Sequence, residues 1–177
     1  MAKKIGAIVS LVLIILVITT TIILGAVKID HNIDCKNPDE IWISYNNKTH
    51  QKMKSEDAEE VVELINDATK ENLLTAMINR TVKNKPELLQ YKTTTTSIPS
   101  NSNYYLIYSY ENKQKVTYKD KDVYYSDLVF TIADTDGKAD VKVYLSEDGA
   151  MKYKYYYVIN VDYSEVFNFL ETKNYNQ

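Results

Sequence analysis

The feature that most constrains this chain is an apolar run of 23 residues, from Ile5 to Val27, that contains no charged side chain. As an α-helix the run spans about 34 Å, which exceeds the roughly 30 Å of hydrocarbon in a bilayer. Its polar side chains are those of Ser10 and Thr19 to Thr21, whose hydroxyls can bond back to carbonyls one turn earlier. The run therefore predicts a single transmembrane helix, which places the protein in a membrane through residues 5–27.

Charges on either side of the run predict its orientation. Lys3 and Lys4 precede it, whereas Lys28 follows it together with Asp30 and Asp34. The excess of basic residues on the N-terminal side favours a cytoplasmic N-terminus. We therefore expect a single-pass protein of the cell membrane whose C-terminal part is extracellular.

A cleaved signal peptide is the alternative to an uncleaved anchor. The apolar core of a signal peptide has about 7–15 residues and precedes a small-x-small cleavage site. The nearest such site is Leu24-Gly25-Ala26, where a large residue stands in place of a small one. Cys35 follows Asp34, which makes a poor lipoprotein cleavage site. These features favour residues 1–27 as an anchor, and a mature N-terminus near Val27 would show cleavage instead.

Beyond the anchor the chain is long enough for one domain. Residues 28–39 are interpreted as a polar stalk, residues 40–173 as one extracytoplasmic domain, and residues 174–177 as a tail. A domain of about 140 residues can bury a core without disulfides or metals.

The first half of this domain predicts a strand pair and a helical region. Residues 41–45 alternate in the way of a strand, and residues 48–53 can return after an Asn-Asn turn. Ser55 is expected to cap a helix whose apolar stripe recurs at helical spacing. The members of the stripe are Ala58, Val61, Val62, Ile65 and Ala68. Apolar spacing continues through residues 73–78, as one helix or as two with a break within residues 69–72.

The second half has the period of two that is typical of strands. Strands are predicted at 104–111, 114–119, 128–133, 139–145 and 151–161, with a further one around 88–96. The separators 111–113, 134–138 and 147–149 are short and turn-like, so neighbouring strands should pair antiparallel. Asp162 or Ser164 is expected to cap a final helix that runs to about Lys173. The predicted class is α+β: one antiparallel sheet packed by an N-terminal helical region and a C-terminal helix.

Charge and composition argue against several function classes. The net charge is -3, and without Lys3 and Lys4 the chain carries 19 basic and 24 acidic residues. Arg80 is the only arginine, so there is no basic patch for nucleic acid. One cysteine and two histidines exclude an intramolecular disulfide and a cysteine zinc cluster, and they disfavour any transition-metal site.

No motif predicts a catalytic, cofactor or metal site. Residues 134–140, DTDGKAD, resemble part of a calcium loop, but Lys138 and Leu145 stand at positions five and twelve of that loop, where oxygen ligands belong, so a hairpin turn is the better interpretation. His31 and His50 are interpreted as surface residues. The acidic residues of the first helix are interpreted as a solvated face; they are Glu56, Asp57, Glu59, Glu60 and Glu63. Cys35 is either an idle thiol, the interpretation we favour, or the site of an intermolecular disulfide.

Tyrosine is unusually abundant, with 16 residues, of which 13 lie between Tyr104 and Tyr163. In the last predicted strand Tyr153, Tyr155 and Tyr157 share one face. The candidate binding face for a glycan or a surface protein comprises Tyr144, Tyr153, Tyr155, Tyr156 and Tyr157. Tyrosine suits such a role because its ring offers contact area at low entropy cost. Ordinary sheet packing is the alternative, since tyrosine is a good strand former.

Two stretches carry a resemblance to a group of bacterial proteins. DEIWISYNNKTHQKMKSEDAEEVVELI, residues 39–65, and VKVYLSEDGAMKYKYYYVINVDYSEVFNFLE, residues 141–171, resemble small membrane-anchored extracytoplasmic domains of AT-rich Gram-positive bacteria. Those domains are mostly of unknown function. The resemblance implies a bacterial surface protein without a specific activity.

The sequence thus favours a non-enzymatic binding or interaction module at the cell surface. A cell-envelope enzyme with an unrecognised site and a regulatory or immunity protein that acts through the membrane helix remain the alternatives. No cofactor is expected.

Overall fold

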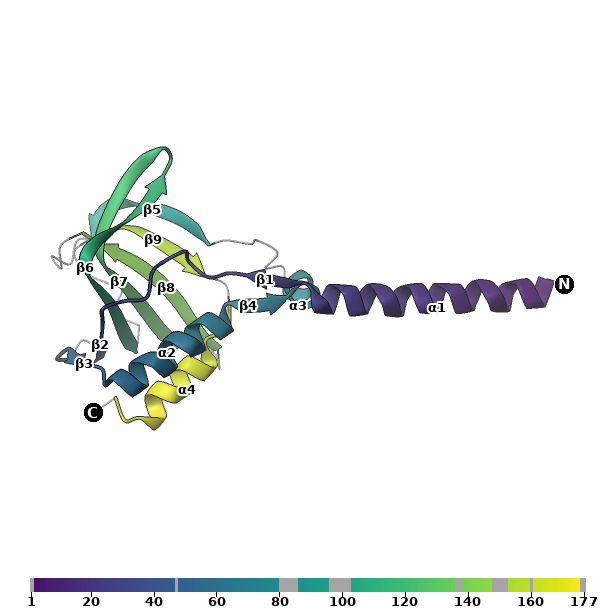
Figure 1. The fold of residues 1–177 in the computed structure, drawn as a ribbon, viewed down its shortest axis with the longest axis horizontal. Coiled ribbons are helices and arrows are strands. Elements are labelled where there is room, and N and C mark those ends of the chain that lie inside the picture. Colours follow the sequence, from purple (N-terminus) through teal and green to yellow (C-terminus); the bar gives the residue numbers. More distant parts are fainter. Residues whose placement is uncertain are drawn as a thin grey trace.

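A long N-terminal helix leads into an α+β domain, as the sequence predicts (Figure 1). The computed structural model describes residues 2–46, 48–79, 86–95, 103–135, 138–147, 153–159 and 161–175. The domain consists of a seven-stranded antiparallel sheet with two helices on one face and a two-stranded ribbon beside the long helix.

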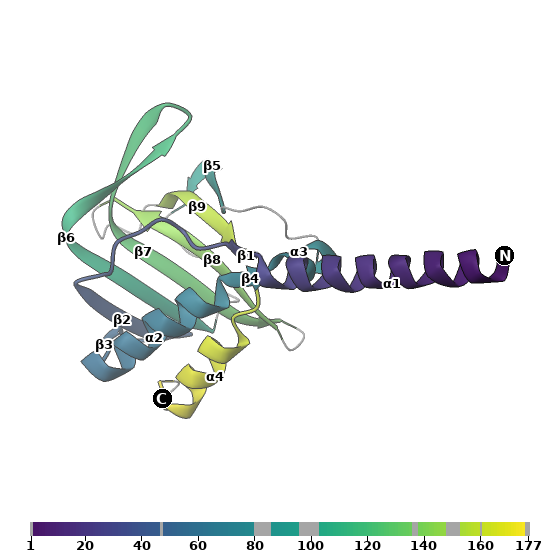
Figure 2. The same ribbon diagram turned by 45° about the vertical axis from the view of Figure 1, so that its right-hand side comes forward.

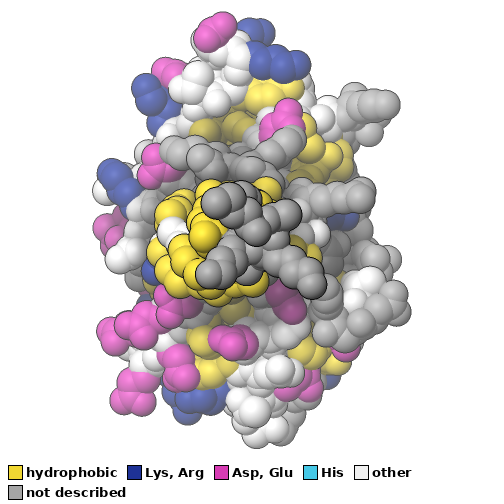
Figure 3. All heavy atoms as spheres, turned by 90° about the vertical axis from the view of Figure 1, so that its right-hand side faces the viewer, with side chains coloured by type: hydrophobic (Ala, Val, Ile, Leu, Met, Phe, Trp, Pro, Cys, Tyr) yellow, Lys and Arg dark blue, Asp and Glu magenta, His cyan; other side chains and the backbone are white. Residues whose placement is uncertain are grey.

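The long helix, α1 (Ala2–Ala26), extends away from the domain (Figures 1 and 2). Its segment Ile8–Ala26 is long and apolar enough to cross a membrane, and none of its residues is fully buried. The hydroxyls of Thr19, Thr20 and Thr21 donate to carbonyls one turn earlier at 2.8–2.9 Å, as expected. The helix therefore presents an apolar surface along its length, which stands in front of the domain when viewed along its axis (Figure 3).

The sheet has the strand order β3-β2-β6-β7-β8-β9-β5. Its strands are β2 (Glu40–Tyr45), β3 (Gln51–Lys52), β5 (Glu87–Thr95), β6 (Tyr104–Tyr118), β7 (Lys121–Thr135), β8 (Lys138–Ser146) and β9 (Tyr153–Ile159). Every neighbouring pair is antiparallel. The predicted strands at 41–45 and 139–145 are confirmed within a residue. Those at 88–96 and 151–161 are confirmed over 88–95 and 153–159, and residues 96, 151, 152 and 160 lie outside the described part of the chain.

One predicted turn in this sheet is wrong. Strand β6 continues through residues 111–113, where the register with β7 shifts between Ser109 and Gln114. The hairpin turn lies instead at Lys119 and Asp120, whose φ angles of 46° and 65° suit a tight two-residue turn. On both sides of this turn one face is buried or half-buried and the other is exposed. The side chains of the covered face are Val116, Tyr118, Val123 and Tyr125. Strand β7 consequently begins at Lys121 instead of residue 128.

Two helices, α2 (Ser55–Ala68) and α4 (Ser164–Thr172), cover one face of the sheet (Figures 1 and 2). Their buried side chains Val61, Ile65, Val166 and Leu170 pack into the main core. The rest of that core comes from the sheet and includes Ile43, Leu106, Phe130, Val143, Leu145 and Ile159. The predicted apolar stripe of α2 is thereby confirmed.

Neither helix start has the side-chain cap that the sequence predicts. Ser55 does not cap α2: it is the first helical residue, and Lys54 in the cap position makes no side-chain bond. At the start of α4 the cap position is held by Tyr163, which makes no side-chain cap bond either. Asp162 lies one residue earlier, where its Oδ1 accepts the backbone N–H of Ser164 at 2.9 Å.

The helical region after residue 55 divides into two helices. Strand β4 (Lys70–Asn72) separates α2 from α3 (Leu73–Asn79), and it pairs antiparallel with β1 (Lys28–Asp30). This ribbon connects the end of α1 directly to the domain.

Residues 28–39 are not a polar stalk. Ile29 and Ile33 are buried, and Cys35 packs against the main core. His31 is only 6% exposed, so its interpretation as a surface residue is also wrong, whereas His50 is exposed as expected. The alternation of buried residues shows that this segment lies against the domain as an extended strand would.

Candidate functional site

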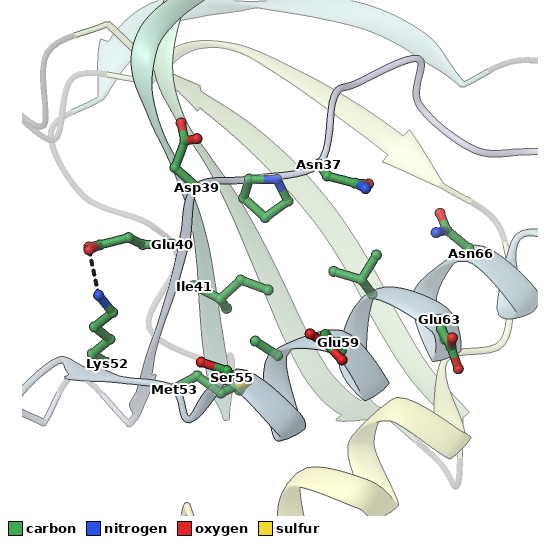
Figure 4. A pocket seen from close by; sticks show the side chains of 13 residues that line it. Asn37, Asp39, Glu40, Ile41, Lys52, Met53, Ser55, Glu59, Glu63 and Asn66 are labelled. Atoms are coloured by element: carbon green, nitrogen blue, oxygen red, sulfur yellow. Dashed lines mark hydrogen bonds and ion pairs between the residues drawn. The ribbon is translucent and has the colours of Figure 1, made fainter.

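A groove of about 570 Å³ lies between α2 and the segment that leads into β2 (Figure 4). Its apolar lining comes from Ile41 on β2, Met53 before α2, and Ala58 and Val62 on α2. Its polar rim includes Asp39, Glu40, Lys52, Glu59 and Glu63. The groove thus combines an apolar floor with a rim of four carboxylates and one ammonium group.

Two of the four carboxylates are already engaged. Oδ2 of Asp39 accepts the backbone N–H of Glu111 at 2.8 Å. Glu40 accepts hydrogen bonds from Nζ of Lys52 and, at 3.1 Å, from Nε1 of Trp42. These bonds, the one from Lys52 above all, lower the pKa of Glu40. Because Lys52 pairs with Glu40, these two residues together add no net charge to the groove.

Glu59 and Glu63 add uncompensated charge to the groove, beside Asp39, whose bond from a neutral N–H leaves its charge in place. They lie one helical turn apart on α2, both side chains are exposed, and within the described part of the chain neither has an ion-pair partner. Because Lys52 is paired with Glu40, the groove carries net negative charge beside its apolar floor. Such a site favours a cationic ligand that also brings apolar groups.

The groove's chemistry suits binding more than catalysis. General acid–base work needs carboxyl groups whose environments differ, as in a desolvated cleft, whereas Glu59 and Glu63 are both open to solvent. Among the described residues there is also no group of three or more His, Cys, Asp or Glu side chains placed to hold a metal ion.

The five tyrosines of the candidate binding face do not share a face. A register shift in β9 places Tyr153 opposite Ser146 and Tyr155 opposite Leu145. Tyr155 and Tyr157 consequently pack against the main core on the helix side of the sheet. Tyr153 joins Tyr144 and Tyr156 in a second cluster on the opposite side. The prediction that Tyr153, Tyr155 and Tyr157 lie together is therefore wrong.

The second cluster is mostly buried. Tyr144 is 1% exposed, and its ring centroid lies 5.7 Å from that of Tyr153, 5.9 Å from that of Tyr156 and 5.8 Å from that of Tyr91 on β5. Burial raises the pKa of Tyr153 to about 12. Tyr91, Ile107 and Tyr156 are half-exposed and the other members are buried, so the cluster resembles a small core more than an open aromatic platform.

Cys35 lies half-buried among tyrosines. Burial raises the pKa of its thiol, and a hydrogen bond with Tyr110 offsets this in part. The hydroxyl of Tyr110 also donates to the carbonyl of Lys36 at 2.9 Å. A thiol with a raised pKa is a weak nucleophile near neutral pH.

Two polar contacts were not predicted from the sequence. Nε2 of His31 lies 3.2 Å from Oε2 of Glu71, and Asp57 accepts hydrogen bonds from Lys173 and Tyr175. The alternation of Ile29, His31 and Ile33 is a signal that would have placed His31 in a buried strand. No comparable signal links Asp57 to residues more than a hundred positions away.

No protein-family profile, no curated protein and no solved structure matches this chain. A function is therefore inferred from the chain's own geometry.

Proposed function

We propose that this protein is a single-pass membrane protein whose α+β domain lies outside the cytoplasm and acts as a non-enzymatic binding module. Its groove beside α2 receives a basic, partly apolar segment of another protein at the cell surface. The observation that carries the proposal is the apolar floor of the groove beside the unpaired carboxylates of Glu59 and Glu63.

The choice of a protein partner follows from the two candidate surfaces. A glycan is usually recognised by an exposed aromatic face, but Tyr144 and Tyr153 are buried. The groove instead offers the half-buried Val62, above the buried Ile41 and Met53, for apolar contact, and the exposed carboxylates of Glu59 and Glu63 for lysine or arginine. Alternating basic and apolar residues in a peptide match this arrangement by charge and by contact.

The extracytoplasmic placement is supported by charge. Lys3 and Lys4 stand before the apolar helix, and the sequence after it is acidic within a few residues. Single cysteines placed at Ala2 and at Asn112, in a Cys35→Ser background, test it in intact cells. A membrane-impermeant maleimide should label the Asn112→Cys variant and spare Ala2→Cys, and the reverse pattern would overturn the orientation.

The groove is tested with a peptide of stated chemistry. The full chain in nanodiscs of neutral lipid is titrated by calorimetry with a synthetic peptide of alternating lysine and leucine, and empty nanodiscs are titrated for subtraction. We expect saturable binding that weakens as salt is raised, because the paired charges are exposed. The counterpart peptide with glutamate in place of lysine should not bind.

Charge reversal in the groove supplies the matched comparison. The double variant Glu59→Lys with Glu63→Lys should bind the basic peptide at least about tenfold more weakly. Glu60→Lys with Glu165→Lys makes the same change in net charge at exposed helical positions outside the groove, and it should retain binding. Equal losses in both double variants, or no binding by the unmodified chain, would refute the groove as the site.

A further inference from the structure

The short helix α3 begins where the long helix α1 ends. The backbone N–H of Leu73 donates to the carbonyl of Val27 at 2.8 Å, and Val27 in turn donates to the carbonyl of Ile23. Helix α3 packs against α1 at this end (Figures 1 and 2). Leu24 is half-buried there, while the other described side chains of α1 are exposed. The two helices therefore meet at the same level along the axis of α1.

The outward side of α3 is apolar. Ala76 is fully buried, whereas Met77 is 52% and Ile78 is 72% exposed. Among the described residues that follow Val27, the one other large hydrophobic side chain with such exposure is Tyr124, on the distant arm of β7. Leu73–Asn79 contains no charged residue. Exposing two adjacent apolar side chains to water is unfavourable, so these side chains favour an apolar environment.

The position of α3 along α1 indicates that this apolar environment is a lipid bilayer. The apolar run from Ile5 to Val27 spans about 34 Å and fills a hydrocarbon layer of roughly 30 Å. Its C-terminal end, where α3 packs, then lies at the boundary between acyl chains and headgroups. The exposed side chains of α3 thus continue the lipid-facing surface of α1.

We propose that α3 is a second membrane contact, in which Met77 and Ile78 insert into the interfacial layer of the same bilayer that α1 spans. This inference rests on the proposed membrane anchoring. Together with the paired strands β1 and β4, two points of contact fix the tilt of the domain and therefore the direction in which its groove faces.

The contact is apolar in character. Acidic side chains gather on one side of the domain surface that is seen along α1 (Figure 3). Near α3, Lys70 is paired with Asp67 at 3.1 Å, which leaves Lys28 as the nearby exposed cation among the described residues. The contact proposed here is therefore made by the uncharged side chains of Met77 and Ile78.

Depth-dependent fluorescence quenching tests the proposal on the full chain. An environment-sensitive dye is attached to a single cysteine in a Cys35→Ser background, in nanodiscs of neutral lipid that hold one chain each. Spin-labelled lipids carry the quencher near the headgroup or near the bilayer centre. The dye at Ile78→Cys should show blue-shifted emission and lose more fluorescence to the shallow quencher than to the deep one. The dye at Tyr124→Cys, a position of similar chemistry far from α1, should show neither effect.

A third position separates this inference from the anchoring on which it rests. The dye at Ile14→Cys, near the middle of α1, should be quenched most strongly from the bilayer centre. If Ile14→Cys is quenched and Ile78→Cys behaves like Tyr124→Cys, the second contact is refuted while the anchor stands. If Ile14→Cys is not quenched, the anchoring itself fails. A blue shift at position 78 without lipid quenching would mean that protein covers α3, which also overturns the proposal.

Discussion

His31, directly after β1, and Glu71 on β4 form a largely buried contact beside the ribbon that connects α1 to the domain, with 3.2 Å between Nε2 and Oε2. The backbone N–H of His31 also donates to the carbonyl of Thr69 at 2.8 Å, and the side-chain amide of Asn32 donates to Asn66 at 2.7 Å. Residues 28–32 are therefore clamped to the end of α2 and to β4. A clamp of this kind transmits the orientation of α1 to the domain, which a flexible stalk would not do.

Replacing His31 by alanine should loosen this clamp locally. Loss of one partner from a buried polar pair costs about 1–3 kcal/mol. Hydrogen exchange of the full chain in nanodiscs should show faster exchange of the amides of residues 28–32 and 70–73, with little change in β6 and β7. His50→Ala, at the exposed histidine, is the control and should leave all of these rates unchanged. Equal exchange in both variants would show that the contact does not hold the ribbon.

Asp57 predicts a pH dependence of stability. Its carboxylate accepts a hydrogen bond from Nζ of Lys173 at 2.7 Å and another from the hydroxyl of Tyr175 at 2.6 Å. These bonds, first the one from Lys173, lower the pKa of Asp57 below its ordinary value. The folded state therefore gains stability from the ionised group above the unfolded pKa of about 3.9, and this gain is lost as the pH falls through the lower folded pKa.

The variant Asp57→Asn should accordingly be less stable by about 1–3 kcal/mol at neutral pH, because both hydrogen bonds are to a charged acceptor. Denaturant unfolding at a series of pH values should show the difference from the unmodified chain shrinking as the pH falls below about 4. Glu60→Gln, at an exposed position on the same helix, should show no such convergence. A difference that is constant with pH would mean that the charge of Asp57 contributes nothing.

Regular periodicity made much of the fold predictable. Val61 and Ile65 mark the buried stripe of α2, and the alternation after Tyr104 marks the sheet, because burial on one face imposes a period on the sequence. The floor of the groove on α2 was part of that same stripe. Its opposite wall was not predictable, since it depends on how residues 28–39 cross the domain.

The other wrong predictions concern Tyr153 and Asp57, whose surroundings leave no trace in the apolar and polar pattern of the sequence. The run Tyr155-Tyr156-Tyr157 reads equally well in either register, so one extra residue before it sends Tyr153 to the other face without any trace in the sequence. Asp57 has the helical position of a solvated acid, but the chain returns to it at Lys173 and Tyr175, a tertiary contact that no local pattern encodes.

The tyrosine cluster around Tyr144 should matter for folding more than for binding. Truncating a fully buried aromatic ring costs about 3–5 kcal/mol, and Tyr144 is 1% exposed. Tyr144→Ala should therefore lower the free energy of unfolding by that amount. Tyr156→Ala should cost distinctly less, because its ring is half-exposed. Neither variant should weaken binding of the basic peptide under conditions where it is folded, and a selective loss of binding in Tyr156→Ala would restore this side of the sheet as a binding face.

Cys35 should be an unreactive thiol in the folded protein. The thiolate is the nucleophile in alkylation and in disulfide exchange, and burial raises the pKa of this thiol, so little thiolate forms near neutral pH. Iodoacetamide should modify Cys35 more slowly in the folded chain than in denaturant, because burial raises the pKa of the thiol and limits access to it. The exposed cysteine of Asn112→Cys, in a Cys35→Ser background, should react at nearly the same rate in both states. Rapid modification of the folded chain, or a covalent dimer on a non-reducing gel, would instead support the intermolecular disulfide, because either result requires a thiol that partners can reach.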